Sequence, residues 1–274
     1  METSNLVEKK YKIGIALSGG GIKGLCHAGA LKALEEFGIK PDIISGASAG
    51  AIVGSLYADG YTPDEIADFF HNMTFREMTK IQFQGGVFQI EQFEKFLDNK
   101  LRSKTFEELK IPLKVVATNL DEGKSVVFCN GTLTNRVIAS STVPILFTPK
   151  NIEGTYYVDG GVLKNFPASV IRNECEMLVG INASPLVAAE YKLGIVSVAM
   201  RSYHFMQKSN TFHDKELCDI LIEPIDMGNY DTFDTGKSKE IFNVGYMSTK
   251  AILEKEDCLL NKKEWLISGN KLSK

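Results

Sequence analysis

Two glycine-rich stretches near the start of the chain contain the residues with the clearest chemical meaning. Residues 46–50 read GASAG and place Ser48 between Gly46 and Gly50, which is the GxSxG pattern of a nucleophile on a sharp strand-to-helix turn. Ser48 could instead be a helix N-cap, which is a common role for serine. An N-cap does not require glycine or alanine at all four flanking positions, so the sequence favours the nucleophile.

The second stretch, residues 18–24, reads SGGGIKG. Three successive glycines, Gly19, Gly20 and Gly21, suit backbone N–H groups that converge on an oxyanion. The N–H group of Ala49, directly after Ser48, is a further candidate donor. The two stretches together are therefore consistent with acyl transfer to a serine.

The same loop also fits the GxGxxG pattern of a dinucleotide site through Gly19, Gly21 and Gly24. Such a site needs an acidic residue at the end of the second strand to bind a ribose hydroxyl. Asp42 precedes that strand, and the carboxyl end of the strand contains Ser45 instead. A Rossmann-like dinucleotide- or phosphate-binding module is therefore the main alternative, and the oxyanion interpretation is preferred.

A serine nucleophile needs a base, and the chain offers a carboxylate and several histidines. Asp159 ends a predicted strand and precedes Gly160 and Gly161, which on spacing alone is typical of a plain turn. His204 or His213 would complete the Ser-Asp-His order of an α/β-hydrolase esterase, although neither has a local signature. The residues alone leave the base open.

The elements that position these residues alternate short apolar runs with helical patterns, which is typical of βαβ units and a mostly parallel sheet. Consecutive parallel strands usually lie side by side, so both glycine stretches are expected at one edge of the sheet. Neighbouring strands lie about 4.8 Å apart, so the loop at 19–24 is expected within reach of Ser48. Strands are predicted at 12–17, 42–45, 113–120, 125–130, 155–161, 176–184 and 218–224. Helices are predicted at 25–37, 49–60, 62–71 and 134–141, and also between the last three strands.

The composition is that of an ordinary globular protein: 274 residues, 44% hydrophobic, with a formal net charge of −3. The absence of a basic excess argues against nucleic acid as a partner. Five cysteines without a CxxC pair predict free thiols and no structural zinc. No signal peptide or bilayer-spanning run is apparent, so we expect a cytoplasmic protein. The oligomeric state cannot be predicted.

Residues 72–100 contain five phenylalanines and the Gly85-Gly86 pair. The first interpretation is a helical hairpin with aromatic side chains in the core. The second is a flap over an apolar substrate, with the glycine pair as its hinge. A transient, peripheral contact with a membrane surface through the apolar side chains around 75–96 is a related hypothesis.

SGGGIKG, GASAG and DGG, in this order, resemble the three sequence blocks of the patatin-like phospholipases. The stretches at 138–149, 157–167 and 219–234 resemble that family as well, and the likeness covers about residues 11 to 250. One departure is Ser18, where many members have an aspartate before the triple glycine, which leaves the anchoring of the loop in question.

The resemblance implies a three-layer, patatin-like α/β sandwich with a mostly parallel central sheet and helices on both faces. It implies one domain over 11–250, with 1–10 and 251–274 as terminal extensions. It also implies hydrolysis of lipid or other acyl esters without a metal or cofactor. By resemblance, Ser48 is the nucleophile, Asp159 the base, and Gly19, Gly20, Gly21 and Ala49 the oxyanion hole, supported by Gly24, Gly46, Gly50, Gly160 and Gly161. A catalytically silent member that binds lipid or a protein partner is a further alternative.

Overall fold

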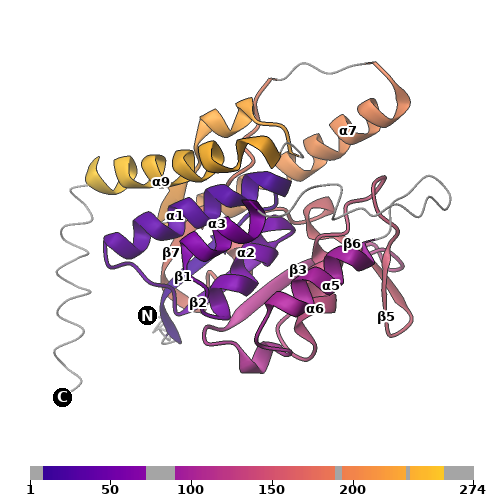
Figure 1. Cartoon of the computed structure of the whole chain (residues 1–274), viewed down its shortest axis with the longest axis horizontal. Helices are drawn as coiled ribbons and strands as arrows, with labels where there is room; N and C mark the ends of the chain where they lie inside the picture. Colours follow the sequence, from indigo (N-terminus) through magenta and orange to yellow (C-terminus); the bar gives the residue numbers. More distant parts are fainter. Residues whose placement is uncertain (1–8, 72–89, 189–192, 233–234, 256–274) are drawn as a thin grey trace, which may run out of the picture.

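The computed structural model describes residues 9–71, 90–188, 193–232 and 235–255, and a twisted sheet runs through its centre (Figure 1). The eight described strands follow the order β5-β6-β3-β2-β1-β7-β8, with β4 paired to β3. Their bounds are β1 (Tyr11–Leu17), β2 (Ile43–Ala47), β3 (Leu113–Asn119), β4 (Lys124–Phe128), β5 (Lys150–Ile152), β6 (Thr155–Asp159), β7 (Cys175–Ile181) and β8 (Ile220–Ile222).

Helices of two kinds connect these strands. The α-helices are α1 (Leu25–Glu36), α2 (Ala49–Ala58), α3 (Pro63–His71), α5 (Glu91–Lys100), α6 (Leu133–Ser140), α7 (Ile195–Ser209), α8 (Phe212–Glu216) and α9 (Ser238–Lys255). The short 3₁₀ turns are η1 (Gly21–Gly24), η2 (Phe106–Glu108), η3 (Gly160–Val162), η4 (Ala168–Val170), η5 (Ile225–Asn229) and η6 (Thr235–Lys237). Among the described helices, none combines the length and the apolar character needed to cross a membrane.

The strands from β3 through β2 and β1 to β8 pair in parallel, whereas the other pairs of β3 and those beyond it are antiparallel. β1 pairs in parallel with β2 and β7, β2 with β3, and β7 with β8. β3 pairs antiparallel with β4 and β6, and β6 pairs antiparallel with β5. The predicted parallel core is thus confirmed, and the sheet as a whole is mixed.

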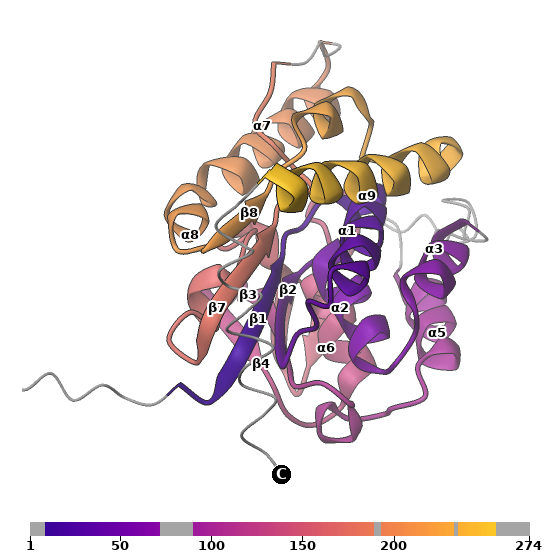
Figure 2. The same ribbon diagram turned by 90° about the vertical axis from the view of Figure 1, so that its left-hand side faces the viewer.

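Both faces of the sheet are buried. Ile13, Ile15 and Leu17 of β1 belong to the main core under α1 and α2, whereas Ala16 belongs to a second cluster with Phe166. Figure 2 shows α1, α2, α3 and α9 on one side of the sheet and α8 on the other. Alternate side chains of one strand therefore pack on opposite layers, as the pleat of a strand requires.

The long helix α9 crosses α1 at two glycines, one on each helix. A Cβ on Gly29 would lie 2.0 Å from the Phe242 carbonyl oxygen, and one on Gly245 would lie 2.1 Å from the Cys26 carbonyl oxygen. Only glycine allows backbones to approach this closely. Sequence patterns did not predict α9, although it covers α1 along much of its length (Figure 1).

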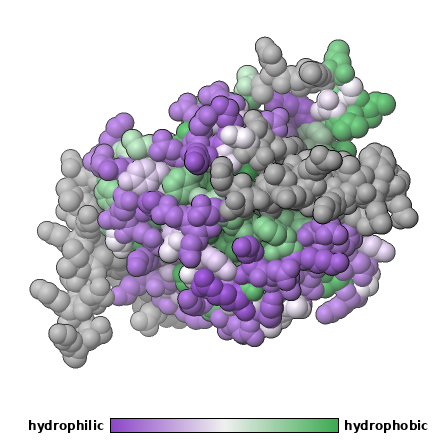
Figure 3. Space-filling model, in the orientation of Figure 1, coloured by the Kyte–Doolittle hydropathy of each residue, from purple (hydrophilic) through white to green (hydrophobic). Residues whose placement is uncertain are grey.

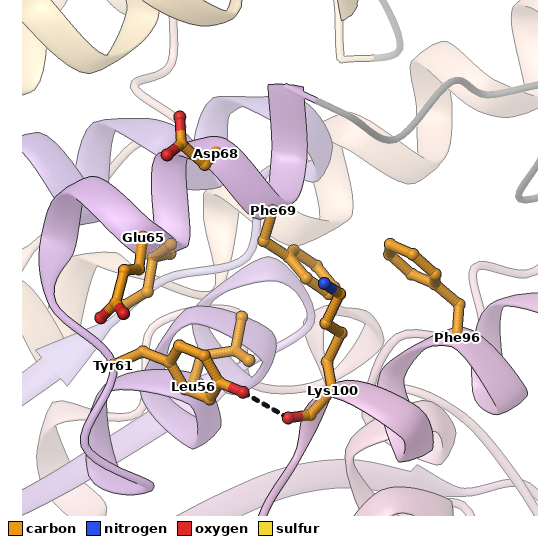
Figure 4. A pocket seen from close by; sticks show the side chains of 8 residues that line it. Leu56, Tyr61, Glu65, Asp68, Phe69, Phe96 and Lys100 are labelled. Atoms are coloured by element: carbon orange, nitrogen blue, oxygen red, sulfur yellow. Dashed lines mark hydrogen bonds between the residues drawn. The ribbon is translucent and has the colours of Figure 1, made fainter.

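A cavity of about 250 Å³ lies between α2, α3 and α5 (Figure 4). Apolar side chains such as Leu56 and Phe69 line it, and the Tyr61 hydroxyl at its edge donates to the Lys100 carbonyl oxygen at 2.5 Å. Leu56 lies eight residues after Ser48, which corresponds to about 12 Å along a helix. The cavity therefore lies away from the GASAG turn.

Most predicted elements are present with bounds shifted by one to three residues. The helices expected between the strands at 176–184 and 218–224 are α7 and α8, whereas residues 150–152 form an unpredicted strand, β5. In the predicted hairpin or flap at 72–100, residues 72–89 lie outside the described residues. Residues 91–100 form α5, where Phe93 is buried and Phe96 packs on Phe69.

Candidate active site

Two strands meet end to end on one edge of β3, and this brings Ser48 and Asp159 together. Ala47, the last residue of β2, pairs with Val116 of β3. Asp159, the last residue of β6, pairs with the next residue of β3, Ala117. β2 and β6 run in opposite directions, so their carboxyl ends converge at this point. Residues far apart in the chain thus become neighbours through strand register.

Ser48 lies on a strained turn between β2 and α2. Its φ of 52° and ψ of −122° are rarely adopted by residues other than glycine. Its carbonyl oxygen accepts the first hydrogen bonds of α2, from Ala51 and Ile52, but its side chain does not cap the helix. The N-cap interpretation is therefore wrong for the hydroxyl group. Strain of this kind is typical of a nucleophile elbow.

The Ser48 hydroxyl donates a hydrogen bond of 2.5 Å to Oδ2 of Asp159. Ser48 is 5% exposed and Asp159 is 0% exposed. The bond is direct, so no imidazole stands between the two side chains. This geometry places a carboxylate within proton-transfer distance of a hydroxyl group, in a site from which most water is excluded.

Burial raises the pKa of Asp159 from its ordinary value of 3.8 to about 6. Hydrogen bonds from Ser48, the Gly161 N–H group at 2.7 Å and the Tyr203 hydroxyl lower the pKa and partly offset burial. The Gly161 contact is that of an Asp-Gly turn, so the turn interpretation is correct for Oδ1. Oδ2 of Asp159 accepts the hydrogen bond from Ser48. The raised pKa makes the ionised carboxylate a stronger base than an ordinary aspartate.

The glycine loop lies against the serine, as strand adjacency predicts. A Cβ on Gly19 would lie 3.1 Å from the Ser48 Cβ. The Gly19 N–H group, however, donates to the Asn165 carbonyl oxygen at 2.9 Å. Within the described part of the chain, the N–H groups of Gly20, Gly21 and Ala49 have no hydrogen-bond acceptor. These three N–H groups are the ones that could bind an oxyanion.

Ser18, the position at which the sequence departs from the expected aspartate, anchors this loop. Its hydroxyl group accepts from the Ala183 N–H at 2.9 Å and donates to the Gly19 carbonyl oxygen at 3.0 Å. Nε2 of His27, which is fully buried, donates to the Ser18 carbonyl oxygen at 2.8 Å. Burial lowers the pKa of His27 to about 4. His27 is therefore a neutral support of the loop.

The remaining glycines of the motifs allow backbones to pass at contact distance. A Cβ on any of them would lie between 2.1 and 2.8 Å from a neighbouring atom, mostly a backbone carbonyl oxygen. Side chains at these positions would push apart the loop, the elbow and the turn that bears the carboxylate. The glycines concerned are Gly24 against Ala49, Gly46 against Gly50, Gly50 against Leu17, Gly160 against Val116 and Gly161 against Gln207.

The residues needed for the alternative functions are not gathered at this site. Asp42, the candidate ribose ligand, accepts from the N–H groups of Lys12 and Ile13 at the opposite edge of the sheet. His213 is exposed on α8, and His204 is half-buried on α7. Burial, together with nearby cations, lowers the pKa of His204 to about 4. The structure gives no support to a dinucleotide site or to an imidazole relay.

Sequence reasoning missed several residues that support the two reactive side chains. Ser140 accepts from the Ser48 N–H group at 2.9 Å and donates to the Val116 carbonyl oxygen at 2.6 Å. Tyr203 of α7 hydrogen-bonds Asp159 and accepts from Gln207 at 2.9 Å. Tyr203 and Gln207 lie on α7, which has no recognised motif, whereas Ser140 lies in the 138–149 stretch that resembles the family, although the resemblance does not single it out.

Asn165 is another supporting residue, between the glycine loop and the DGG turn. A Cβ on Gly19 or on Gly161 would lie 2.3 or 2.7 Å from its side-chain oxygen. The side chain is fully buried, and both of its polar atoms are without a partner in the described part of the chain. Asn165 thus fills the space that glycine leaves on both sides of the site. It lies in the 157–167 stretch that resembles the family.

Comparison with known proteins agrees with this geometry. The model of the family described as patatin-like phospholipase matches residues 15–171, which include the glycine loop, the elbow and the DGG turn. The chain therefore belongs to the patatin-like phospholipase family.

The chain is also similar to curated relatives and, in its fold, to a solved structure. The chain is 32% identical over 181 residues to an uncharacterized NTE family protein of Mycobacterium tuberculosis, covering 65% of this chain and 48% of that protein. It is 27% identical over 281 residues to patatin-like phospholipase domain-containing protein 6 of Homo sapiens, covering 88% and 20%. The chain thus spans less than half the length of these relatives. VipD from Legionella pneumophila has the same fold, with a TM-score of 0.61 at 18% identity over 89% of this chain and 67% of VipD.

Proposed function

We propose that this chain is a serine acyl hydrolase that cleaves ester bonds of lipids with Ser48 as nucleophile and Asp159 as base. The 2.5 Å hydrogen bond between the two side chains is the observation on which the proposal rests. Family membership supports a lipid substrate, since the family is described as patatin-like phospholipase. Neither the fold nor the site requires a cofactor for this chemistry.

In the first half-reaction Asp159 accepts the hydroxyl proton as Ser48 attacks the ester carbonyl carbon. The negative charge develops on the carbonyl oxygen, where the N–H groups of Gly20, Gly21 and Ala49 can donate to it. The N-terminal end of α2 points at the same position and favours negative charge. The protonated Asp159 then gives its proton to the leaving alcohol, and an acyl ester of Ser48 remains.

In the second half-reaction Asp159 takes a proton from water, which attacks the acyl carbon. Collapse of the second tetrahedral intermediate breaks the bond to Ser48 and returns the proton to its hydroxyl group. Ser140 fixes the backbone of the nucleophile through the Ser48 N–H group in both steps. Tyr203 and Gly161 hold the carboxylate in place.

The first test is covalent labelling with a long-chain alkyl fluorophosphonate, followed by intact mass measurement and peptide mapping. We expect a single adduct on Ser48. Ser48→Ala should give no adduct, and Asp159→Asn should react at least about 10³-fold more slowly, because triad and dyad members act as a unit. Ester hydrolysis by the same variants should fall in parallel.

Matched controls separate these effects from loss of structure. Ser125→Ala and Asp226→Asn change exposed side chains of the same types and should label and hydrolyse normally. His204→Ala and His213→Ala should also retain hydrolysis. A folded wild-type protein that forms no adduct, or a folded His204→Ala variant without activity, would contradict the Ser-Asp dyad.

A further inference from the structure

Three cationic side chains gather beside the glycine loop: Lys23 of η1, and Arg201 and Lys208 of α7. We call them the cation cluster. Lys23 is 6% and Lys208 is 8% exposed. In residues 9–71, 90–188, 193–232 and 235–255, no ion pair or side-chain hydrogen bond satisfies any of the three, and Nε of Arg201 is buried without a hydrogen-bond partner. The Arg201 guanidinium lies over the Phe205 ring, 4.5 Å from its centroid. Lysine and arginine are rarely buried unless they are paired.

The members of the cation cluster lie on neighbouring elements. Arg201 and Lys208 are two turns apart on one face of α7, and a Cβ on Gly161 would lie 2.4 Å from the side-chain nitrogen of Gln207, the residue before Lys208. Burial, and after it the charge of Lys208, lowers the pKa of Lys23 to about 8. Burial, followed by the charge of Arg201, lowers the pKa of Lys208. Both lysines and Arg201 also lower the pKa of His204, although burial lowers it more. Like charges crowded in a partly dry site repel one another, so an anion that binds there gains from all three.

The cation cluster is directly connected to the proposed active site. Lys23 precedes Gly24, where a Cβ would lie 2.8 Å from the Cβ of Ala49. On α7, Arg201 and Lys208 flank Tyr203, which hydrogen-bonds Asp159. The cation cluster thus lies on η1, which includes Gly21 of the proposed oxyanion hole, and on α7, which holds the carboxylate of Asp159 through Tyr203.

The charges of the surroundings leave a positive balance. His204, between Arg201 and Lys208 on α7, is neutral at neutral pH because its pKa is about 4. Among the described residues, the acidic side chain whose charge acts on Lys23 and His204 is Asp231, which raises the pKa of both. In this part of the chain three cations thus face one carboxylate, which suits a phosphate group, since ammonium and guanidinium groups are its usual protein ligands.

We propose that the cation cluster binds the phosphate group of a glycerophospholipid while an ester carbonyl of the same molecule lies over Ser48. The inference rests on the proposed acyl hydrolase function and names its substrate class. In such a lipid only a few bonds separate the phosphate from an ester, which matches a cluster on the loop that adjoins the nucleophile.

The surface near the cation cluster favours a lipid over free phosphate. The beginning of α7 and the residues before it expose Leu193, Val196 and Ile195, of which Ile195 is 92% exposed. Figure 3 shows hydrophobic residues gathered at the upper right, where Figure 1 places the start of α7. Apolar side chains beside a cationic site complement a molecule that has both acyl chains and a phosphate.

The test compares dihexanoylphosphatidylcholine with dihexanoylglycerol, both as monomers, because the two substrates differ only by the phosphocholine group. Arg201→Gln and Lys208→Met should each lower the ratio of kcat/KM for the phospholipid to that for the diacylglycerol at least tenfold. Lys40→Gln removes an exposed positive charge at the opposite edge of the sheet, and should leave the ratio and both rates unchanged. Thermal unfolding of each variant checks that the fold is retained.

A binding measurement separates this inference from the proposed function. Calorimetric titration of Ser48→Ala with dihexanoylphosphatidylcholine should show binding that Arg201→Gln weakens at least tenfold, whether or not the wild type hydrolyses any ester. If the ratio and the binding do not change in the variants, there is no phosphate site. If inorganic phosphate binds as tightly as the phospholipid and inhibits hydrolysis of both substrates equally, the cluster binds a free anion, and the headgroup assignment is wrong.

Discussion

At the scale of single residues, the surroundings of Asp159 shift the pKa of its carboxyl group in opposite directions. Burial favours the protonated form, whereas its three hydrogen-bond donors favour the ionised form, and burial dominates. Because the folded state raises the pKa from 3.8 to about 6, stability falls as the pH rises across this interval. The cost above pH 6 is about 3 kcal/mol. The same shift makes the group a useful base.

A pH profile tests this shift. We expect kcat/KM for a neutral soluble ester such as p-nitrophenyl butyrate to be constant above about pH 6 and to fall tenfold per pH unit below it, because Asp159 must be ionised to accept the proton. The profile should be recorded with wild type and with His204→Ala. An inflection near pH 4, or one that His204→Ala moves, would contradict the assignment of Asp159 as base.

The sequence singled out the two residues of the proposed dyad, but not the residues that support them. Ser48 and Asp159 lie in short motifs whose joint order resembles one family, so both could be named without a structure. Tyr203 could not, because it contacts Asp159 from a helix without a motif. The Gly19 N–H group was predicted as an oxyanion donor, but it bonds the Asn165 carbonyl oxygen, a contact that depends on the fold of the DGG turn.

At the scale of elements, backbone proximity explains why the motifs contain so much glycine. The elbow lies across the end of β1, and a Cβ on Gly50 would lie 2.3 Å from the Leu17 carbonyl oxygen. In α2 itself glycine is unfavourable, since alanine is a better helix former by about 1 kcal/mol. The contact with β1 is therefore what requires glycine at position 50.

Two glycines of α2 provide a matched comparison of this effect. Gly50→Ala should lower the free energy of unfolding by several kcal/mol and abolish labelling of Ser48, because the clash is with a backbone carbonyl group. The nearest atoms to the Cβ of Gly54→Ala are side-chain methyl groups, of Ile44 and Leu113 at 3.2 Å and of Leu17 at 3.5 Å, so stability should change by less than about 1 kcal/mol. Chemical denaturation measures both. Equal effects of the two substitutions would show that close backbone approach at the elbow is not the reason why position 50 requires glycine.

The limits of element prediction have a similar physical origin. Short apolar runs identified β1, β2 and β7, because parallel strands are buried on both faces and therefore lack polar alternation. The pairing of β6 with the end of β3 could not be predicted, because it depends on where β2 stops along that edge. Adjacency of the two glycine stretches followed from local topology, whereas adjacency of Ser48 and Asp159 required this long-range register.

At the scale of the whole molecule, we propose that residues 11–250 form a single cooperative domain. The main core includes side chains of β1, α1, α3, α5 and α9, so elements from both ends of the described chain contribute to it. The glycine crossing of α1 and α9 joins the region that follows the glycine loop to the last described helix. Disruption of this crossing should therefore destabilise the entire domain.

Gly245→Ala tests this cooperativity. Alanine improves the intrinsic helix propensity of α9, so local effects alone would raise the melting temperature. The added Cβ would lie 2.1 Å from the Cys26 carbonyl oxygen, so we expect the opposite, a fall of roughly 5 to 10 °C. Met247→Ala, on an exposed position of the same helix, is the control and should have little effect.

Differential scanning calorimetry of the wild type and of Gly245→Ala should show one transition that moves as a whole, with equal calorimetric and van't Hoff enthalpies. A second transition that Gly245→Ala leaves in place would show that the chain contains two domains.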